Sequence, residues 1–307
     1  MTTEALAPPG NPSADSAGPG RRPRPPGGPA DGLANRAALR KLLAFACFLV
    51  TAVTLIPVVM MVLVAFQSDA ESMAAQPSFW PSSWHPENLE RAFELVPLGR
   101  YLINTVIFAG GTTLLETVTA SLAAYAFARL NFPGRTWLFG IYLGTLMIPT
   151  QVTLIPQFVL VAKLHGIDTW PGMILPHAFT ALGVFLLRQF FLGIPRDYEE
   201  AARLDGANRW QAFTRVIVPL AVPAIATLAV FKFIGQWNNL LWPLVISNSD
   251  ATRTAAVGLQ VFQDTNGTQW NLLLMAATIT TVPLIVLFFL TQRWFVRGIT
   301  MSGLGGR

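Results

Sequence analysis

The side chains best suited to chemistry or binding lie in a polar stretch, residues 198–213, between two long apolar runs. Glu199 and Glu200 lie near its start, and carboxylates near a helix N-terminus are favoured by the helix dipole. Ala201 and Ala202 follow, with high helix propensity and almost no bulk. A short helix of this kind presents charges beside a small flat surface, which suits non-covalent insertion into a groove of another protein.

The same stretch predicts a helix-turn-helix. Asp197 can cap the first helix, and Gly206 suits the left-handed residue that ends it. A second helix is expected from Asn208, and Pro219 marks the entry to the next apolar run. An ordinary loop with helices lying on a membrane surface is the alternative interpretation.

Covalent chemistry has few candidate residues. The chain has one cysteine, Cys47, in an apolar run, and three histidines that are too scattered for a zinc signature. It also lacks the Gly-x-x-x-x-Gly-Lys-Ser/Thr pattern of a phosphate-binding loop. Because an intramembrane enzyme would need a nucleophile paired with a base, we expect a chain without catalytic residues, metal site or cofactor of its own.

Two charged residues, Glu116 and Lys232, fall inside predicted membrane spans. Such residues usually face the interior of a helix bundle or a water-filled path, because a charge at bilayer depth is costly. They could line a substrate path, they could pair with each other, or Lys232 could extend its amine to the membrane surface.

Trp237, Asn238 and Asn239 form a second polar group inside a span. An indole ring can cover the apolar face of a sugar while amides bind its hydroxyl groups, so these residues are candidates for the substrate path. Alternatively, the amides hold helices together and the tryptophan marks a membrane interface.

Composition identifies the elements that must carry these residues. The 307-residue chain is 52% hydrophobic and only 12% charged, with a mean hydropathy of +0.48, whereas soluble domains are about 25% charged. About 20 apolar residues cross a bilayer as a helix. We therefore predict six spans, at residues 42–66, 101–128, 136–161, 172–192, 220–246 and 270–292.

Basic residues orient these spans. With the N-terminus in the cytoplasm, 16 Lys and Arg residues fall on the inside and four on the outside. Because short cytoplasmic segments are enriched in Lys and Arg, this distribution predicts that both termini and residues 195–219 are cytoplasmic. The basic sequence pI of 9.9 therefore reflects membrane orientation, and no nucleic-acid partner is expected.

The pattern divides the chain into four parts. A segment rich in Pro, Gly and Ala, residues 1–35, is expected to be a disordered cytoplasmic tail. Residues 36–100 hold the first span and an extracytoplasmic segment. Residues 101–292 hold spans 2–6 with the loop at 195–219, and residues 293–307 form a second cytoplasmic tail.

Three motifs resemble one protein family. Glu200-Ala201-Ala202, Gly206 and the Val216-Ile217-Val218-Pro219 ending resemble the Glu-Ala-Ala loop of bacterial ABC importer permeases. Valines stand at positions 216 and 218, where the family prefers Ile and Leu. The segment Ala124 to Arg129 and the Trp237-Asn238 pair are similar to carbohydrate-uptake permeases of the maltose type.

This resemblance implies an all-α membrane protein with the type I ABC importer permease fold, located in the bacterial cytoplasmic membrane. It implies four kinds of partner: a dimer of ATPase subunits that bind ATP and Mg, a second permease subunit, an extracytoplasmic solute-binding protein and membrane lipid. The residues implied to couple this chain to the ATPase are Glu199, Glu200, Ala201, Ala202, Asp205 and Gly206.

The resemblance favours import of a sugar or oligosaccharide by alternating access. A non-sugar polar solute such as glycerol phosphate is the alternative substrate, and an anionic substrate would make Lys232 more important. A secondary transporter usually contains inverted repeats with broken helices, and no such duplication is visible in the sequence.

Overall fold

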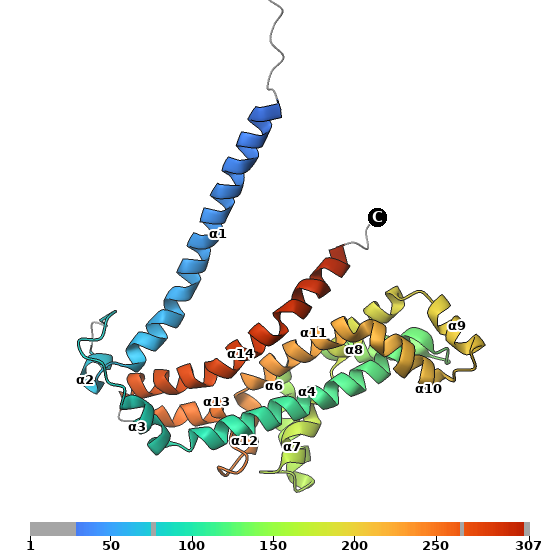
Figure 1. The fold of residues 1–307 in the computed structure, drawn as a ribbon. Coiled ribbons are helices and arrows are strands. Elements are labelled where there is room, and N and C mark those ends of the chain that lie inside the picture. Colours follow the sequence, from blue (N-terminus) through green and yellow to red (C-terminus); the bar gives the residue numbers. More distant parts are fainter. Residues whose placement is uncertain (1–28, 75–77, 265–266, 304–307) are drawn as a thin grey trace, which may run out of the picture. The chain divides into compact units, whose positions relative to one another are not determined.

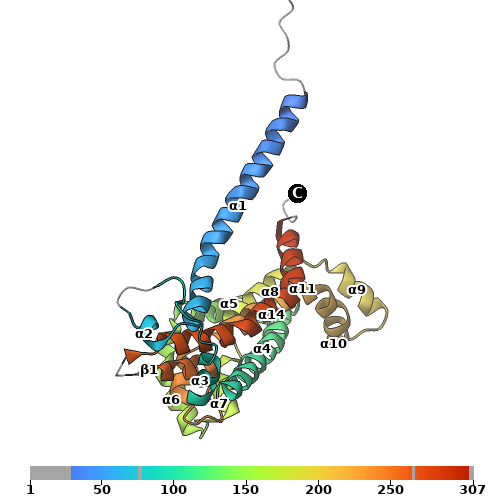
Figure 2. The same ribbon diagram turned by 60° about the vertical axis from the view of Figure 1, so that its left-hand side comes forward.

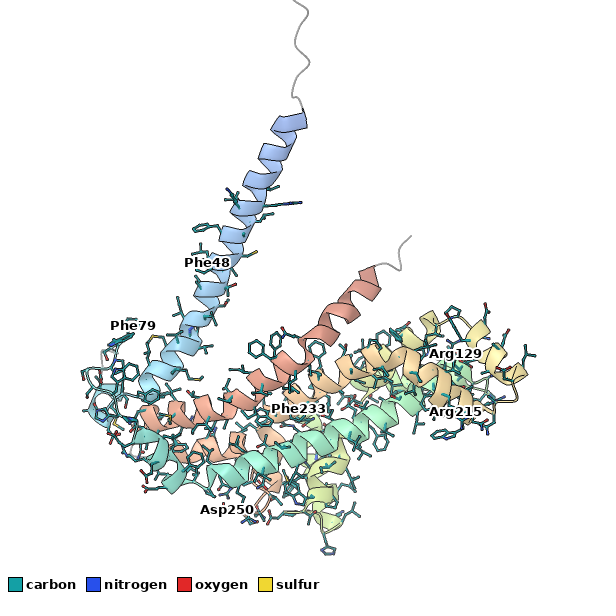
Figure 3. All side chains as sticks on the ribbon, in the orientation of Figure 1. Phe48, Phe79, Arg129, Arg215, Phe233 and Asp250 are labelled. Carbon is teal, nitrogen blue, oxygen red and sulfur yellow. The ribbon has the colours of Figure 1, made fainter. Side chains whose placement is uncertain are left out.

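The computed structural model describes residues 29–74, 78–264 and 267–303, which are mostly helical (Figure 1). The chain divides into two units, residues 1–56 and 57–307, and the boundary lies within helix α1 (Pro29–Ala65). In the first unit, α1 exposes large apolar side chains such as Phe48 (Figure 3). Its segment Leu39–Ala65 is long and apolar enough to cross a membrane, close to the predicted first span.

The predicted tail, residues 1–35, lies outside the described residues except for its last part. Residues 29–35 form the first turns of α1. Between the first and second predicted spans, the second unit has two small helices, α2 (Asp69–Ser72) and α3 (Asn88–Leu95).

The remaining elements of the second unit follow in chain order. They are α4 (Leu98–Arg129), α5 (Arg135–Gly144), the 3-10 turn η1 (Thr145–Met147), α6 (Thr150–Lys163), α7 (Trp170–Ile174), the 3-10 turn η2 (Leu175–His177), α8 (Ala181–Gly193), α9 (Asp197–Leu204), α10 (Arg209–Ala212), the π-helical turn η3 (Phe213–Ile217), α11 (Val218–Trp237), α12 (Leu241–Ile246), α13 (Ala255–Gly258), the 3-10 turn η4 (Leu259–Phe262), the antiparallel strands β1 (Gln263–Asp264) and β2 (Gly267–Thr268), and α14 (Trp270–Gly303).

The largest core of this unit lies where α4, α8 and α11 pack together (Figures 1 and 2). Ala120, Ala124 and Ala128 are fully buried on one face of α4. Small residues at this spacing let helices approach closely, as in other membrane bundles. Leu187 of α8 and Ala221 of α11 belong to the same core.

Two predicted spans are bent rather than straight. In place of span 3, α5 with η1 is followed by α6 after a bend of 101°. Pro149 follows the break, and Ile148 before it is extended, as expected of a residue that precedes proline. In place of span 4, α7 with η2 is followed by α8 after a bend of 49°, and Thr180 caps the new helix at the break.

The fifth predicted span differs at both ends. A continuous helical stretch runs from Arg209 to Trp237, so the helix begins before Leu220 and Pro219 is no boundary. Pro219 directly follows the π-helical turn η3 within this stretch. The helix breaks after Trp237 and resumes as α12.

The sixth predicted span, residues 270–292, matches a candidate span within α14, and the helix continues to Gly303. Within the described residues, four helices are long and apolar enough to cross a membrane, and up to six spans result if each bent pair counts as one.

Candidate functional site

The loop at residues 195–219 forms the predicted helix-turn-helix. Gly206 has a φ of +86°, the left-handed conformation that favours glycine after a helix. Asn208 then caps α10, because its side chain accepts a hydrogen bond from the N–H of Gln211 while the Gln211 side chain accepts one from the N–H of Asn208. The predicted cap of the first helix was wrong: Arg196 occupies the cap position and Asp197 is already helical.

The two adjacent glutamates of α9 point in different directions. The Glu199 side chain is 6% exposed, whereas Glu200 is exposed. Glu199 Oε1 lies 3.2 Å from Arg129 Nε, and its Oε2 lies 3.8 Å from Nη2 of Arg203 one turn later. Since consecutive helical residues point about 100° apart, Glu199 faces the interior of this chain and Glu200 faces outward.

The outward side of α9 carries most of the residues predicted to couple the chain to an ATPase. Its most exposed apolar side chain, Leu204, is 90% exposed. Ala202 is half-buried, and the predicted coupling residues that are exposed are Glu200, Ala201, Asp205 and Gly206. The structure therefore presents carboxylates, a small alanine and one leucine together on an accessible surface.

Arg129 holds this helix against the bundle, a role that sequence reasoning missed. It lies in the last turn of α4, at the end near α9 and α10 (Figure 3). Its Nη2 donates to the carbonyl oxygens of Phe191 and Ile194, both at 2.5 Å, at the C-terminal end of α8. The sequence feature that could have indicated this role is an arginine at the end of a predicted span, Arg129, together with the adjacent glutamates of a later loop.

Tyr125, one turn earlier on α4, anchors the second helix of the loop. Its hydroxyl donates to the carbonyl oxygen of Arg209 at 3.5 Å, and its ring lies 4.8 Å from the ring of Phe213. Tyr125 and Phe213 are both buried. The helix-turn-helix is therefore attached to α4 through both of its helices.

The structure brings Glu116 and Lys232 together as an ion pair between α4 and α11. The hydroxyl of Thr180, at the start of α8, donates to the other carboxylate oxygen, Oε1. The Glu116 side chain is 3% exposed and that of Lys232 is 14% exposed. Of the three interpretations of these charges, direct pairing is the one that the geometry displays.

Trp237, Asn238 and Asn239 lie at the break between α11 and α12. Trp237 is buried, and its Nε1 donates to the carbonyl oxygen of Thr280 on α14 at 3.2 Å. Asn239 Nδ2 donates to Oε1 of Gln236 at 2.9 Å. Asn238 is exposed and bonds back to its own helix. The indole and one amide thus hold helices in position, while Asn238 is accessible.

At the other end of α4, polar side chains hold the loop that follows α12. The hydroxyl of Tyr101 donates to Asp250 Oδ1 at 2.6 Å. Asn104 Nδ2 donates to the carbonyl oxygens of Asp250 and Arg253, at 3.1 and 2.8 Å. These roles were not predictable from the sequence, because the partners lie about 150 residues away in the chain and hydrophobic periodicity reports only local structure.

Asp168 binds the same loop from the segment between α6 and α7. Its carboxylate accepts hydrogen bonds from the N–H groups of Asn248 and Ser249, at 3.1 and 3.2 Å, and from the hydroxyl of Thr252. Burial works to raise the pKa of Asp168, but the hydrogen bonds from Ser249, Thr252 and Asn248 lower this pKa to about 2. The carboxylate is therefore charged at neutral pH.

Comparison with known proteins identifies the family of this chain. Residues 116–301 match the family described as "Binding-protein-dependent transport system inner membrane component". The chain is 32% identical over 257 residues to the arabinooligosaccharides transport system permease protein AraQ of Halalkalibacterium halodurans, covering 83% of this chain and 92% of AraQ. It is 35% identical over 228 residues to the sn-glycerol-3-phosphate transport system permease protein UgpE of Yersinia pestis, covering 74% of this chain and 81% of UgpE.

The fold is also similar to a chain in the crystal structure of a bacterial ABC transporter that imports the acidic polysaccharide alginate. The TM-score is 0.72 at 22% identity, and the match covers 89% of this chain and all of the other chain. The family match covers more than half of the sequence, and the relatives agree with it. This chain therefore belongs to the family of inner membrane components of binding-protein-dependent transport systems.

Proposed function

We propose that this chain is one of two membrane-spanning subunits of an ATP-driven importer that receives a sugar or oligosaccharide from an extracytoplasmic binding protein. Its family and its relative AraQ, an arabinooligosaccharide permease, support this function. The chain forms half of the translocation path and does no covalent chemistry, while separate ATPase subunits bind ATP and Mg.

The proposed topology has six spans with both termini in the cytoplasm. It treats each bent helix pair as one span, in addition to the four unbroken candidates. The excess of Lys and Arg in the predicted inside segments, 16 against four, supports the orientation. In this topology, α9 and Arg129 lie on the cytoplasmic side.

The helix α9 is proposed to insert into a groove of the ATPase. The observation that carries this proposal is its exposed side, where Glu200 and Ala201 lie beside the 90% exposed Leu204. Burial of this exposed leucine by a partner would lower the free energy of the complex. The carboxylate next to it favours a partner with a basic surface. Closure of the ATPase dimer on ATP would then move α9, and the spans attached to it would turn to open the path outward.

A neutral carbohydrate is the proposed substrate class. The charge of Lys232 is neutralised by Glu116 in contact with it, so this part of the bundle offers no free cation to an anionic solute. Identity to UgpE makes a glycerol phosphate the alternative. That alternative would need another basic group, or separation of the Glu116–Lys232 pair when substrate enters.

Co-purification tests the ATPase contact. The chain would be expressed with the ATPase and the second permease encoded beside it, as wild type, Glu200→Arg or Glu90→Arg. Glu90 is an exposed glutamate on α3, remote in sequence from α9, and serves as the matched control. We expect Glu200→Arg to lose the ATPase and uptake while Glu90→Arg keeps both. Normal uptake by Glu200→Arg would contradict this proposal.

A further inference from the structure

Among the described contacts, Arg129 of α4 is the one side chain that binds both α8 and α9. Its Nε lies 3.2 Å from Glu199 on α9, and its Nη2 donates to the carbonyl oxygens of Phe191 and Ile194 at the end of α8. Only 4% of its side chain is exposed. A planar guanidinium can satisfy a carboxylate and carbonyl groups at once, because its donors point in fixed, diverging directions.

Neighbouring contacts stiffen the junction at Arg129, where α4, α8 and α9 meet. The C-terminal end of a helix carries partial negative charge, so the α8 carbonyls attract the guanidinium. A second hydrogen bond joins α4 and α8 in the opposite direction: Arg188 Nε of α8 donates to the carbonyl oxygen of Phe127 on α4 at 3.2 Å. The Arg188 guanidinium also lies 4.2 Å from the ring centre of Phe139 on α5. Because water has little access to Arg129, these bonds are stronger than exposed ones.

We propose that Arg129 is the positioning residue that transmits displacement of α9 to α4 and α8, and that Glu199 is its partner rather than a contact of the ATPase. This inference rests on the proposed function of α9. The two adjacent glutamates have different roles: Glu200 faces the ATPase, and Glu199 joins α9 to the spans. From Arg129, the rigid helix α4 carries the movement about 20 Å to Glu116, which is paired with Lys232 on α11.

A double-mutant cycle tests this proposal in the complete complex with its ATPase and second permease. The variants are Arg129→Gln, Glu199→Gln and the two combined, because glutamine removes charge with little loss of volume. Arg203→Gln is the matched control, since Arg203 also approaches Glu199 but its side chain is 48% exposed. Three quantities are measured: ATPase retained on purification, ATP hydrolysis rate, and labelled oligosaccharide imported per ATP hydrolysed.

We expect the single variants to retain the ATPase and hydrolyse ATP, but to import about tenfold less substrate per ATP, within the range of known coupling effects. The double variant should be no worse than the poorer single variant, because both changes break one junction. Arg203→Gln should behave as wild type.

Three results would overturn the proposal: loss of the ATPase by Glu199→Gln, multiplying effects in the double variant, or normal import per ATP in Glu199→Gln. If Arg129→Gln does not insert into the membrane, Glu199→Gln alone decides, by the first and third results. Failure of the proposed function looks different, because Glu200→Arg would then keep both ATPase and uptake.

Discussion

The two halves of α4 hold their neighbours by different chemistry. At its N-terminal end, Tyr101 and Asn104 bind the loop after α12 through neutral side-chain donors (Figure 3 labels Asp250 in that loop). Toward the C-terminal end, Glu116 and Arg129 form ion pairs with Lys232 and Glu199. We call these regions the neutral end, residues 98–105, and the charged half, residues 116–129.

This difference in chemistry predicts where a single substitution should destabilise the protein most. A hydrogen bond from a neutral donor contributes about 1 kcal/mol net to a carbonyl oxygen and about 1.5–3 kcal/mol to a charged group such as the Asp250 carboxylate. The Asp250 side chain is 52% exposed, so water can partly replace that bond. Removing one partner of a buried ion pair costs about 3–5 kcal/mol, because it leaves an uncompensated charge. The charged half also joins α4 to α8, α9 and α11, which are the elements that would move together during transport.

The largest effect is expected at Glu116 and Lys232. Glu116→Gln or Lys232→Met alone should destabilise the protein by about 3 kcal/mol or more, because the remaining charge is buried without its counter-charge. The double variant should recover much of this loss. Thermal unfolding of the purified complex would measure it, and a double variant as unstable as the sum of the single variants would show that the pair is not a unit.

The next largest effect concerns packing at the neutral end. A Cβ atom added at Gly258 would lie 2.3 Å from Cδ2 of the Tyr101 ring. Tyr101 is fully buried, so the ring cannot move aside freely. Gly258→Ala should therefore destabilise the protein by about 1–3 kcal/mol, as overpacking does in other cores. Gly235→Ala is the control, because a Cβ there meets nothing within 4 Å; equal unfolding temperatures for both variants would refute this close contact.

Some features of the fold and of the site could be predicted from the sequence, and others could not. The sixth span and the turn at Gly206 were predictable, because one depends on a long apolar run and the other on the backbone freedom of glycine. The break at Thr180 was missed, because hydropathy does not distinguish a straight span from a bent one. A kink at Pro149 was predictable, because a proline inside a span is a common cause of bending. Glu199 and Glu200 have the same local preferences, and the inward one is recognised only from its contact with Arg129, a residue 70 positions earlier on α4.

A smaller effect is expected from Tyr101→Phe. This change removes the hydroxyl that donates to Asp250 at 2.6 Å but keeps the buried ring. A loss of about 1.5 kcal/mol in the free energy of unfolding is expected, the low end for a hydrogen bond to a charged group, because the Asp250 side chain is 52% exposed. Thermal unfolding beside the Glu116 variants gives the direct comparison, and a loss as large as that of Glu116→Gln would remove the distinction between the two halves.

The smallest effect is the pH dependence of the loop held by Asp168. Its pKa in the folded protein, about 2, is below its ordinary value of 3.8, so its stabilisation is present above about pH 4 and is lost as pH falls toward 2. The difference in unfolding temperature between wild type and Asp168→Asn should stay constant from about pH 5 to pH 8 and shrink below about pH 4. A difference that changes between pH 6 and 8 would point to another titrating group.

The decisive experiment for the importer function is ATP-driven uptake in reconstituted vesicles. The complete complex would be reconstituted with its binding protein outside and ATP at the ATPase side, and uptake of labelled arabino-oligosaccharide would be compared with that of sn-glycerol 3-phosphate. Our account predicts oligosaccharide uptake that requires ATP and is abolished by Glu200→Arg. Uptake that continues without ATP or the ATPase subunits would contradict it.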